Sequence, residues 1–237
     1  MSPRPITVIT PTTGKDGLFK LIDSMNKQSV PYEHILLWDD KRDDKFLYPD
    51  PKTFETLSPY NVAGFSETSK GSMRYSIVIP SNIVQGPAAG SSLRSIGMMA
   101  ANTPYVTFAD DDIWWEENHL KTILKEVEGK GWAYCKRKVW SNKMEYIGID
   151  EFESVGDSTD RKVPYEMVDN NCMIFHRRLG SSSAVIYRET QEYNDDRLMY
   201  AFLKQHAGIP GKVNEATVNQ ICPERLEVMF RQYCTKG

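Results

Sequence analysis

Three successive aspartates, Asp110, Asp111 and Asp112, are the side chains of this sequence best suited to chemistry. They follow a short β-type run at residues 105–109. Adjacent carboxylates repel one another at neutral pH, so three at a strand end are costly unless a cation or hydrogen-bond donors stabilise them. Mg²⁺ and Mn²⁺ take oxygen ligands and often bind through one or two carboxylates. The alternative is that these acids cap the next helix, where negative charge is favourable.

Two further pairs of acids stand at the ends of predicted elements. Asp39 and Asp40 follow an apolar run at residues 34–38, and Asp195 and Asp196 precede a helical pattern. Helix capping is the alternative role for Asp195 and Asp196. In an open α/β sheet, ligands bind beyond the carboxyl ends of the strands. Acids at several such ends therefore favour one shared site.

The overall composition indicates an ordinary globular protein with a net charge of −3 over 237 residues. No linker-like stretch separates two cores, so we expect a single domain over residues 1–237. The near-neutral charge gives no global argument for nucleic acid or an anionic membrane. The sequence has no signal-peptide pattern and no run near the roughly 18 to 20 apolar residues of a membrane helix, which favours a cytoplasmic location.

The cysteine and histidine spacing argues against several metal and redox sites. The four cysteines are scattered without a Cys-x-x-Cys pair, and no His-Glu-x-x-His occurs. His176, beside two arginines in a predicted loop, could bind phosphate or acceptor, and His206 could reach a metal. A surface histidine is the simpler interpretation for His176. For Trp114 and Trp115, core packing is favoured for at least one ring, with stacking on an acceptor sugar as the alternative.

Alternating strands and helices in the amino-terminal half must position these acids. Short apolar runs predict strands at residues 6–9, 34–38, 75–80 and 105–109. The residues between and after these strands predict helices that start near Asp16, near Arg94 and near Leu120. Strand, helix and strand with short connections imply right-handed βαβ units and a parallel sheet. Residues 41–76 show no sustained period and are assigned mainly to loops.

The carboxyl-terminal half has a different pattern. Strands are predicted at residues 132–140 and 144–149, joined by a hairpin turn, and another at 183–187. Helices are predicted at residues 197–205 and 226–233, and an exposed loop covers 151–161. The sequence therefore predicts a mixed α/β domain whose carboxyl-terminal half carries antiparallel additions.

The order of these parts resembles family 2 glycosyltransferases with the GT-A fold. Five segments carry the resemblance: residues 6–12, 36–40, 86–94, 108–115, and 182–188 with 194–198. The resemblance implies an α/β fold in which a Rossmann-like, mostly parallel mixed sheet is flanked by helices. It also implies that residues 1–115 bind a nucleotide sugar and residues 116–237 bind the acceptor.

The resemblance implies a metal-dependent, inverting glycosyltransferase that moves a sugar from a nucleotide-sugar donor, most simply a UDP-sugar, to an acceptor hydroxyl. Mn²⁺ or Mg²⁺ at Asp110 and Asp112 would stabilise the leaving diphosphate. Asp195 is the first candidate for the general base and Asp196 the second, because Asn194-Asp195-Asp196 stands where the family usually has Glu-Asp. The implied donor-binding residues are Thr10, Pro11, Thr12, Asp39, Asp40, Gly86, Pro87, Arg94, Asp110 and Asp111.

Several alternatives remain open at this point. The acceptor could be a glycan, a lipid-linked sugar, a protein or a modified nucleic acid, and a homodimer is compatible with the sequence. A nucleotidyltransferase acting on sugar phosphates also uses strand-end acids, a cation and a nucleotide. Against it, residues 10–17 lack the glycine-rich basic loop associated with that class. The third hypothesis is a nucleotide- or carbohydrate-binding module without catalysis.

Overall fold

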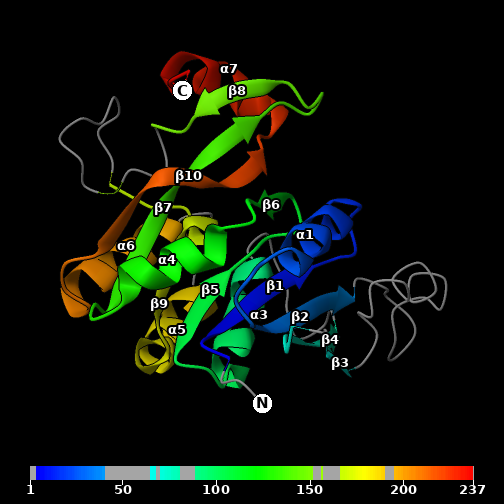
Figure 1. The fold of residues 1–237 in the computed structure, drawn as a ribbon, viewed down its shortest axis with the longest axis vertical. Coiled ribbons are helices and arrows are strands. Elements are labelled where there is room, and N and C mark those ends of the chain that lie inside the picture. Colours follow the sequence, from blue (N-terminus) through cyan, green and yellow to red (C-terminus); the bar gives the residue numbers. More distant parts are fainter. Residues whose placement is uncertain are drawn as a thin grey trace.

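A computed structural model of the chain, drawn in Figure 1, provides the fold. It describes residues 4–40, 65–67, 70–80, 89–151, 156, 166–189 and 195–236. Most of the two predicted loops, 41–76 and 151–161, lies outside these ranges, as do Gly86, Pro87 and the side chain of Asp40. None of the helices in the described ranges has the length and hydropathy needed to span a bilayer.

The amino-terminal half forms a largely parallel sheet. Strands β1 (Ile6–Thr12), β2 (Glu33–Asp40), β4 (Met73–Pro80) and β5 (Tyr105–Phe108) run parallel, and β3 (Phe65–Glu67) pairs antiparallel with β4. Their order is β3-β4-β2-β1-β5. The chain therefore moves from β1 to β2 on one side and later returns to place β5 on the other.

Two helices cover opposite faces of this sheet. In α3 (Ala89–Ala100), Gly97 lies against Ile9 and Leu37, and a Cβ there would come within 2.4 Å of the Ile9 side chain. Helix α1 (Gly17–Asn26) lies on the other face, where Asn26 accepts a 3.3 Å hydrogen bond from Arg74. Arg74 pairs in register with His34, so their side chains lie on the same face of the sheet. His34 is three residues from Leu37, so this face is opposite to the one that Leu37 and α3 share.

The carboxyl-terminal half continues the same sheet with mixed strand directions. After β5 come β9 (Met173–His176), β7 (Trp132–Trp140), β10 (Gly211–Ile221) and β6 (Ile113–Trp115), while β8 (Tyr146–Ile149) pairs with β7. Only the β7–β10 pairing is parallel among these described strands. The helices and 3-10 turns of this half are α4 (His119–Val127), η2 (Asn170–Cys172), η3 (Arg177–Leu179), α5 (Gly180–Glu189), α6 (Asp195–His206) and α7 (Glu224–Tyr233).

The predicted fold class is confirmed: a mostly parallel α/β sheet flanked by helices, with antiparallel strands in the second half. The predicted strand at residues 183–187 is wrong, because this segment belongs to helix α5. Its small residues allow close packing on α3: Ser95 donates a 2.6 Å hydrogen bond to the carbonyl of Ala184, and Ser183 Oγ lies 3.6 Å from Met98 Sδ. Strand β1 also extends to Thr12, so Thr10, Pro11 and Thr12 are strand residues rather than a loop.

Candidate active site

The predicted acids meet at the point where the connectivity of the sheet reverses. Strand β1 has β2 on one side and β5 on the other, and such a reversal is where ligands bind in open α/β sheets. The Thr12 hydroxyl, at the end of β1, donates a 2.8 Å hydrogen bond to Asp111, just beyond β5. A Cβ on Gly17, the first residue of α1, would lie 2.1 Å from the Asp111 carbonyl oxygen. Glycine at this position lets α1 start directly against the acidic triplet.

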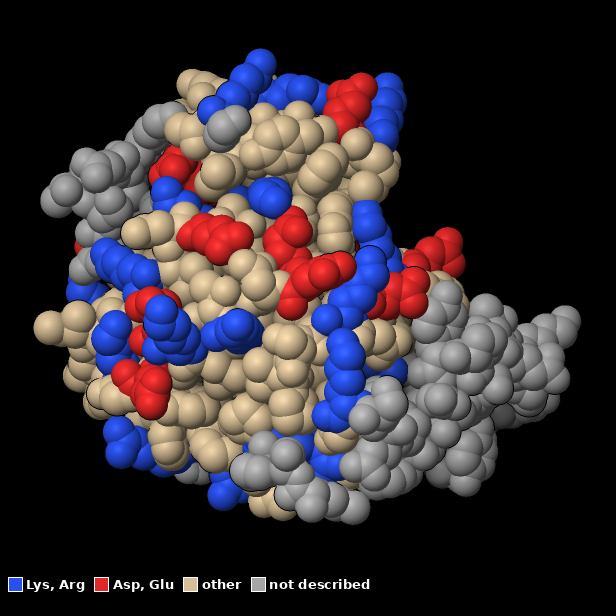
Figure 2. All heavy atoms as spheres, in the orientation of Figure 1, with Lys and Arg blue, Asp and Glu red and all other residues tan. Residues whose placement is uncertain are grey.

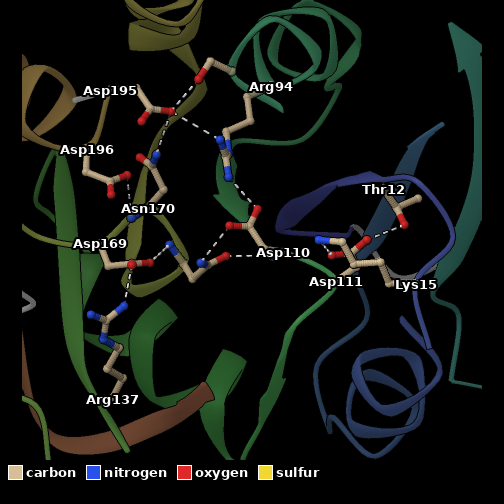
Figure 3. Close-up of polar contacts among 12 residues, drawn as sticks. Thr12, Lys15, Arg94, Asp110, Asp111, Arg137, Asp169, Asn170, Asp195 and Asp196 are labelled. Carbon is tan, nitrogen blue, oxygen red and sulfur yellow. Dashed lines mark hydrogen bonds and ion pairs between the residues drawn. The ribbon is translucent and has the colours of Figure 1, made fainter. Parts of the chain in front are cut away.

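The carboxylate of Asp111 is held by the amino-terminal half alone (Figure 3). Besides Thr12, the Lys15 ammonium lies 3.3 Å away. The Asp111 charge raises the pKa of Lys15 above its usual value. The Thr12 hydroxyl also accepts a 2.9 Å bond from the backbone N–H of Gly14, which fixes its direction. Asp111 is therefore a buried, prearranged acceptor.

The carboxylate of Asp110 faces the other way, toward α3 and η2 (Figure 3). Arg94 donates to one oxygen at 2.5 Å, and the Asn171 amide donates to the other at 3.1 Å. The Asn171 side-chain oxygen in turn accepts the Asp110 backbone N–H at 2.7 Å. Asn171 thus holds both the main chain and the side chain of Asp110.

Arg94 also connects Asp110 to Asp195, which comes from the carboxyl-terminal half. Its guanidinium lies 3.3 Å from Asp195 Oδ2, which also accepts from Ser91 at 2.7 Å and from the Asn170 amide at 3.3 Å. The Arg94 and Asp195 side chains are only 11% and 12% exposed. Two acids 85 positions apart in sequence therefore share one largely buried cation.

Asp196 and Asp169 complete the acidic cluster. Asp196 accepts a 3.3 Å bond from the backbone N–H of Asn170. Burial, and then the negative charges of Asp169 and Asp195, raise the pKa of Asp196 well above its ordinary value. Asp169 caps η2 by accepting the Asn171 N–H at 2.8 Å and is paired with the buried Arg137 guanidinium. Burial and the neighbouring acids therefore disfavour the charged form of Asp196.

Asp112 is the member of the triplet that lacks donors. Burial and the charges of Asp110, Asp111 and Asp169 raise its pKa to about 7. Its Oδ1 is buried, and no described residue donates a hydrogen bond to it. Figure 2 shows acidic side chains gathered across the middle of one face of the molecule, in the region where Figure 1 places β6. A cation would relieve this accumulation of negative charge.

The chemistry of these oxygens fits a cation that a ligand helps to hold. In the described part of the chain, no group of three or more His, Cys, Asp or Glu side chains is arranged to hold a metal ion. Mg²⁺ and Mn²⁺ do not need such a cage, because substrate phosphates and water often supply most of their ligands. Asp112, with one buried oxygen that lacks a donor, meets that more modest requirement.

Some other predicted residues lie away from this cluster. Thr10 is fully buried within β1, and its hydroxyl is 3.0 Å from His34 Nε2. Asp39, by contrast, is buried at the end of β2, at the same sheet edge as Thr12. The idea that His206 could reach a metal beside the triplet is wrong: it ends α6 about 16 Å of helix from Asp195, and its ring packs against Phe202 at 4.7 Å.

The two tryptophans after the triplet are packing residues. Trp115 is 3% exposed and stacks on His119 with ring centroids 4.4 Å apart. Trp114 lies between the Lys20 ammonium, 3.2 Å from its ring centroid, and Trp140 at 5.7 Å. The preference for core packing is thus confirmed for Trp115. The Lys20 ammonium covers one side of the Trp114 ring, and stacking of a sugar on Trp114 stays a prediction.

Sequence reasoning missed the residues that join the acids to one another. These are Lys15, Ser91, Arg137, Asp169, Asn170 and Asn171. The run Asp-Asn-Asn at 169–171 carried a signal, because three polar residues directly before the apolar run 172–175 are typical of a capped turn. Its partners could not be inferred locally.

Comparison with known proteins adds evidence at the level of the fold. No family model and no curated protein matches the sequence. Among solved structures, S. aureus TarS 1–349 in complex with UDP matches with a TM-score of 0.64 and 18% identity over 95% of this chain and 65% of that one. The same protein in complex with UDP-GlcNAc matches with a TM-score of 0.56 and 16% identity over 93% and 59%. A longer TarS chain matches with 0.57 and 18% over 92% and 37%.

The chain shares its mixed α/β fold with the TarS structures. At 16–18% identity, the likeness to TarS extends to the fold alone. The chain spans between 37% and 65% of the length of these structures. Substrates and mechanism must therefore be argued from the residues of this chain.

Proposed function

We propose that this protein is a glycosyltransferase that uses a nucleotide-sugar donor, most simply a UDP-sugar. One observation carries the proposal: Arg94 joins Asp110, at the end of β5, to Asp195, at the start of α6, beside the switch point of the sheet. An acid suited to the donor and an acid suited to the acceptor thus lie on either side of one guanidinium. The TarS complexes with UDP and UDP-GlcNAc support this choice of donor.

The donor side of the proposed site is the end of β1 and β5. Asp111, held by Thr12 and Lys15, is a fixed hydrogen-bond acceptor for the ribose hydroxyls or for an N–H group of the base. Lys15 is 65% exposed and can turn from Asp111 toward a diphosphate, while Thr12 still donates to the buried Asp111 carboxylate. Asp39, at the end of the neighbouring strand β2, lies at the same edge.

The proposal includes a divalent cation, Mn²⁺ or Mg²⁺. Asp112 and Asp110 would hold it, Asp112 through the buried oxygen that lacks a donor in the described residues. When bound, such a cation stabilises the negative charge that develops on the leaving diphosphate. This chain's own cations near the triplet, Arg94 and Lys15, are already paired with carboxylates.

Asp195 is the proposed general base, and Asp196 is its neighbour with a raised pKa. In an inverting transfer, the acceptor hydroxyl oxygen bonds to the anomeric carbon on the face opposite the diphosphate, and the carbon–oxygen bond to the diphosphate breaks. The hydroxyl proton passes to Asp195. The described donors to Asp195 all reach Oδ2, so Oδ1 is the oxygen proposed to accept the proton. The raised pKa of Asp196 disfavours its charged form, which makes Asp196 the second candidate for the base.

The test compares Asp195→Asn with Asp196→Asn. For Asp195→Asn we expect kcat for transfer from UDP-sugars to fall by about 10³-fold, because general bases contribute about 10²- to 10⁴-fold. Asp196→Asn removes an acid whose charged form is disfavoured and is expected to cost less than about tenfold, below the contribution of a general base. Transfer and donor hydrolysis are measured with Mn²⁺ and a panel of hydroxyl acceptors, and UDP binding by calorimetry. The reverse order of the two effects would move the base to Asp196.

A binding module without catalysis is separated by the same measurements. It would bind UDP or a nucleotide sugar but show neither transfer nor donor hydrolysis with any acceptor. A thermal-shift screen of nucleotides with and without Mn²⁺ first identifies the donor, since a specific ligand stabilises the fold by mass action. Stabilisation by UDP that requires Mn²⁺ and is lost in Asp112→Ala supports the proposed cation site.

A further inference from the structure

A cavity lies at the opposite end of β5 from the acidic triplet. It has a volume of about 650 Å³ and is lined by Tyr105, Gly129, Lys130, Gly131, His176, Arg178, Ala207 and Ile209. Tyr105 begins β5, and Asp110 is five residues further along, roughly 16 Å away at the rise of a strand. The cavity is therefore separate from the candidate active site.

Three connections form the walls of this cavity. They are the turn between α4 and β7, the start of η3, and the turn between α6 and β10. Gly131 allows the α4–β7 turn to meet the α6–β10 turn, because a Cβ there would lie 2.5 Å from the Ala207 carbonyl oxygen. The backbone N–H of His176, just before η3, donates to the Gly131 carbonyl at 2.9 Å. This bond joins the start of η3 to the α4–β7 turn. The cavity is thus a product of defined contacts between secondary-structure elements.

Its polar lining consists of cations and hydrogen-bond donors. Lys130 and Arg178 bring two positive charges, and no acidic side chain is among the lining residues. Lys130 also has an ion pair, at 3.8 Å, with Glu126 one helical turn earlier. The chain as a whole carries a net charge of −3, so this local excess of positive charge runs against the overall balance. Arginine and lysine together are typical ligands of phosphate groups.

His176 adds a donor whose direction is fixed. Its Nδ1 accepts the backbone N–H of Arg178 at 3.1 Å, so the neutral ring carries its proton on Nε2. Partial burial and the charges of Arg178 and Arg177 lower the pKa of His176, which keeps the ring neutral at physiological pH. Nε2–H is then the donor that His176 can offer to a ligand.

The remaining lining is apolar. The ring of Tyr105 meets His176 edge-on, with centroids 5.5 Å apart and an interplanar angle of 74°. Ile209 has 88% of its surface exposed at the rim. Apolar walls with a few convergent polar groups are typical of small-molecule sites, and about 650 Å³ falls within their usual range of volumes.

We propose that this cavity is a second binding site and that it takes a small organic phosphate monoester. Arg178 and Lys130 bind the phosphate, His176 Nε2–H donates to one of its oxygens, and Tyr105 and Ile209 pack against the organic part of the ligand. The site is independent of the proposed glycosyl transfer. It gives the protein a means to bind a phosphorylated metabolite while a donor occupies the other end of β5.

The test is calorimetric titration of the full chain with phenyl phosphate in the presence of saturating UDP, which occupies the donor site. Arg178→Gln is expected to weaken binding about tenfold or more, since it removes a charge-assisted contact. Arg177→Gln is the matched control. It removes the same charge one residue away, but Arg177 does not line the cavity and donates to the Ala101 carbonyl at 2.8 Å. Unchanged affinity in this control supports a specific site.

Two outcomes would overturn the proposal: an equal loss of affinity in Arg177→Gln and Arg178→Gln, or no binding of phenyl phosphate by the wild-type chain. A third arm uses inorganic phosphate. Two results together support an organic ligand: inorganic phosphate binds more weakly than phenyl phosphate, and Ile209→Ser lowers only the affinity for phenyl phosphate. Equal affinity for the two probes rejects it. If UDP does not bind, the same pair of variants is titrated without UDP, so a failure of the proposed function leaves this test intact.

Discussion

Asp110 and Asp111 are neighbours in the chain, yet they are held in different ways. Asp111, only 5% exposed, bonds to Thr12 and Lys15, which lie within a few residues of each other at the end of β1. Asp110, with 29% of its side chain exposed, bonds to Arg94 and to Asn171, a residue of the carboxyl-terminal half. We call these two sets of contacts the Asp111 side and the Asp110 side of the site.

The two sides differ in how far the effect of a change should spread. The Asp111 side is a neutral hydroxyl and an exposed lysine around one carboxylate, so its loss should act locally. The Asp110 side is a connected set of charges that reaches Asp195, so a change in one member should be felt at the others. The Asp111 side is thus suited to hold a donor, and the Asp110 side to couple the donor to the acceptor.

Arg94→Gln should break the Asp110 side and have the largest effect on stability. It leaves the carboxylates of Asp110 and Asp195 without their shared cation, and removing one partner of a buried pair costs about 3 kcal/mol or more. For a chain of this size that corresponds to a fall in melting temperature of roughly 10 °C. Thermal unfolding measures it at neutral pH.

Arg94→Lys is the companion variant. It keeps the charge but cannot bond to Asp110 and Asp195 with two separate nitrogens, so it should recover only part of the stability. A melting temperature for Arg94→Gln within about 2 °C of the wild type would mean that the Asp110 side is not a connected charge network.

The two sides also differ in how far the sequence could predict them. The strands and helices around the Asp111 side follow one another along the chain, and their periodicity sufficed to place Thr12 and the triplet at one edge. The Asp110 side depends on β9, whose four residues pair with strand residues 39 or more positions earlier. That pairing sets residues 170–172 beside Asp110, and no local pattern encodes it.

Two residues illustrate the physical limits further. Within the run Lys136, Arg137 and Lys138, the central side chain is 1% exposed, and the buried acids Asp150 and Asp169 pair with it there. In α5, Ser183 and Ala184 stand in an apolar run that is compatible with a strand. Their packing on α3 selects the helix instead. Both outcomes are decided by tertiary contacts.

Asp112→Asn sharpens the comparison by removing the charge that neither side neutralises. The folded protein raises the pKa of Asp112 from about 4 to about 7, so its folded state holds a proton that the unfolded chain has lost in that range. Wild-type stability should therefore fall as pH rises from about 4 to about 7. The variant should lack this loss and be more stable at pH 8 by on the order of 2 kcal/mol.

The measurement is thermal unfolding of both proteins from pH 4 to pH 8 with a chelator present. In samples without the chelator, added Mn²⁺ should narrow the difference in stability between the two proteins at pH 8 by stabilising the wild type. Parallel curves for the two proteins across this range would contradict the raised pKa of Asp112.

The smallest effect is expected on the Asp111 side, from Thr12→Val. This change keeps the shape of the side chain and removes one hydrogen bond to a buried carboxylate, at a cost of about 1 kcal/mol, while Lys15 still contacts Asp111. Lys15→Gln should cost less, because its side chain is 65% exposed and such pairs contribute little. Thr12→Ser retains the hydroxyl and is the control. The two sides differ as proposed only if Thr12→Val lowers the affinity for UDP but not the rate of transfer from bound donor. That rate, measured in single-turnover experiments, should stay within about twofold of the wild type.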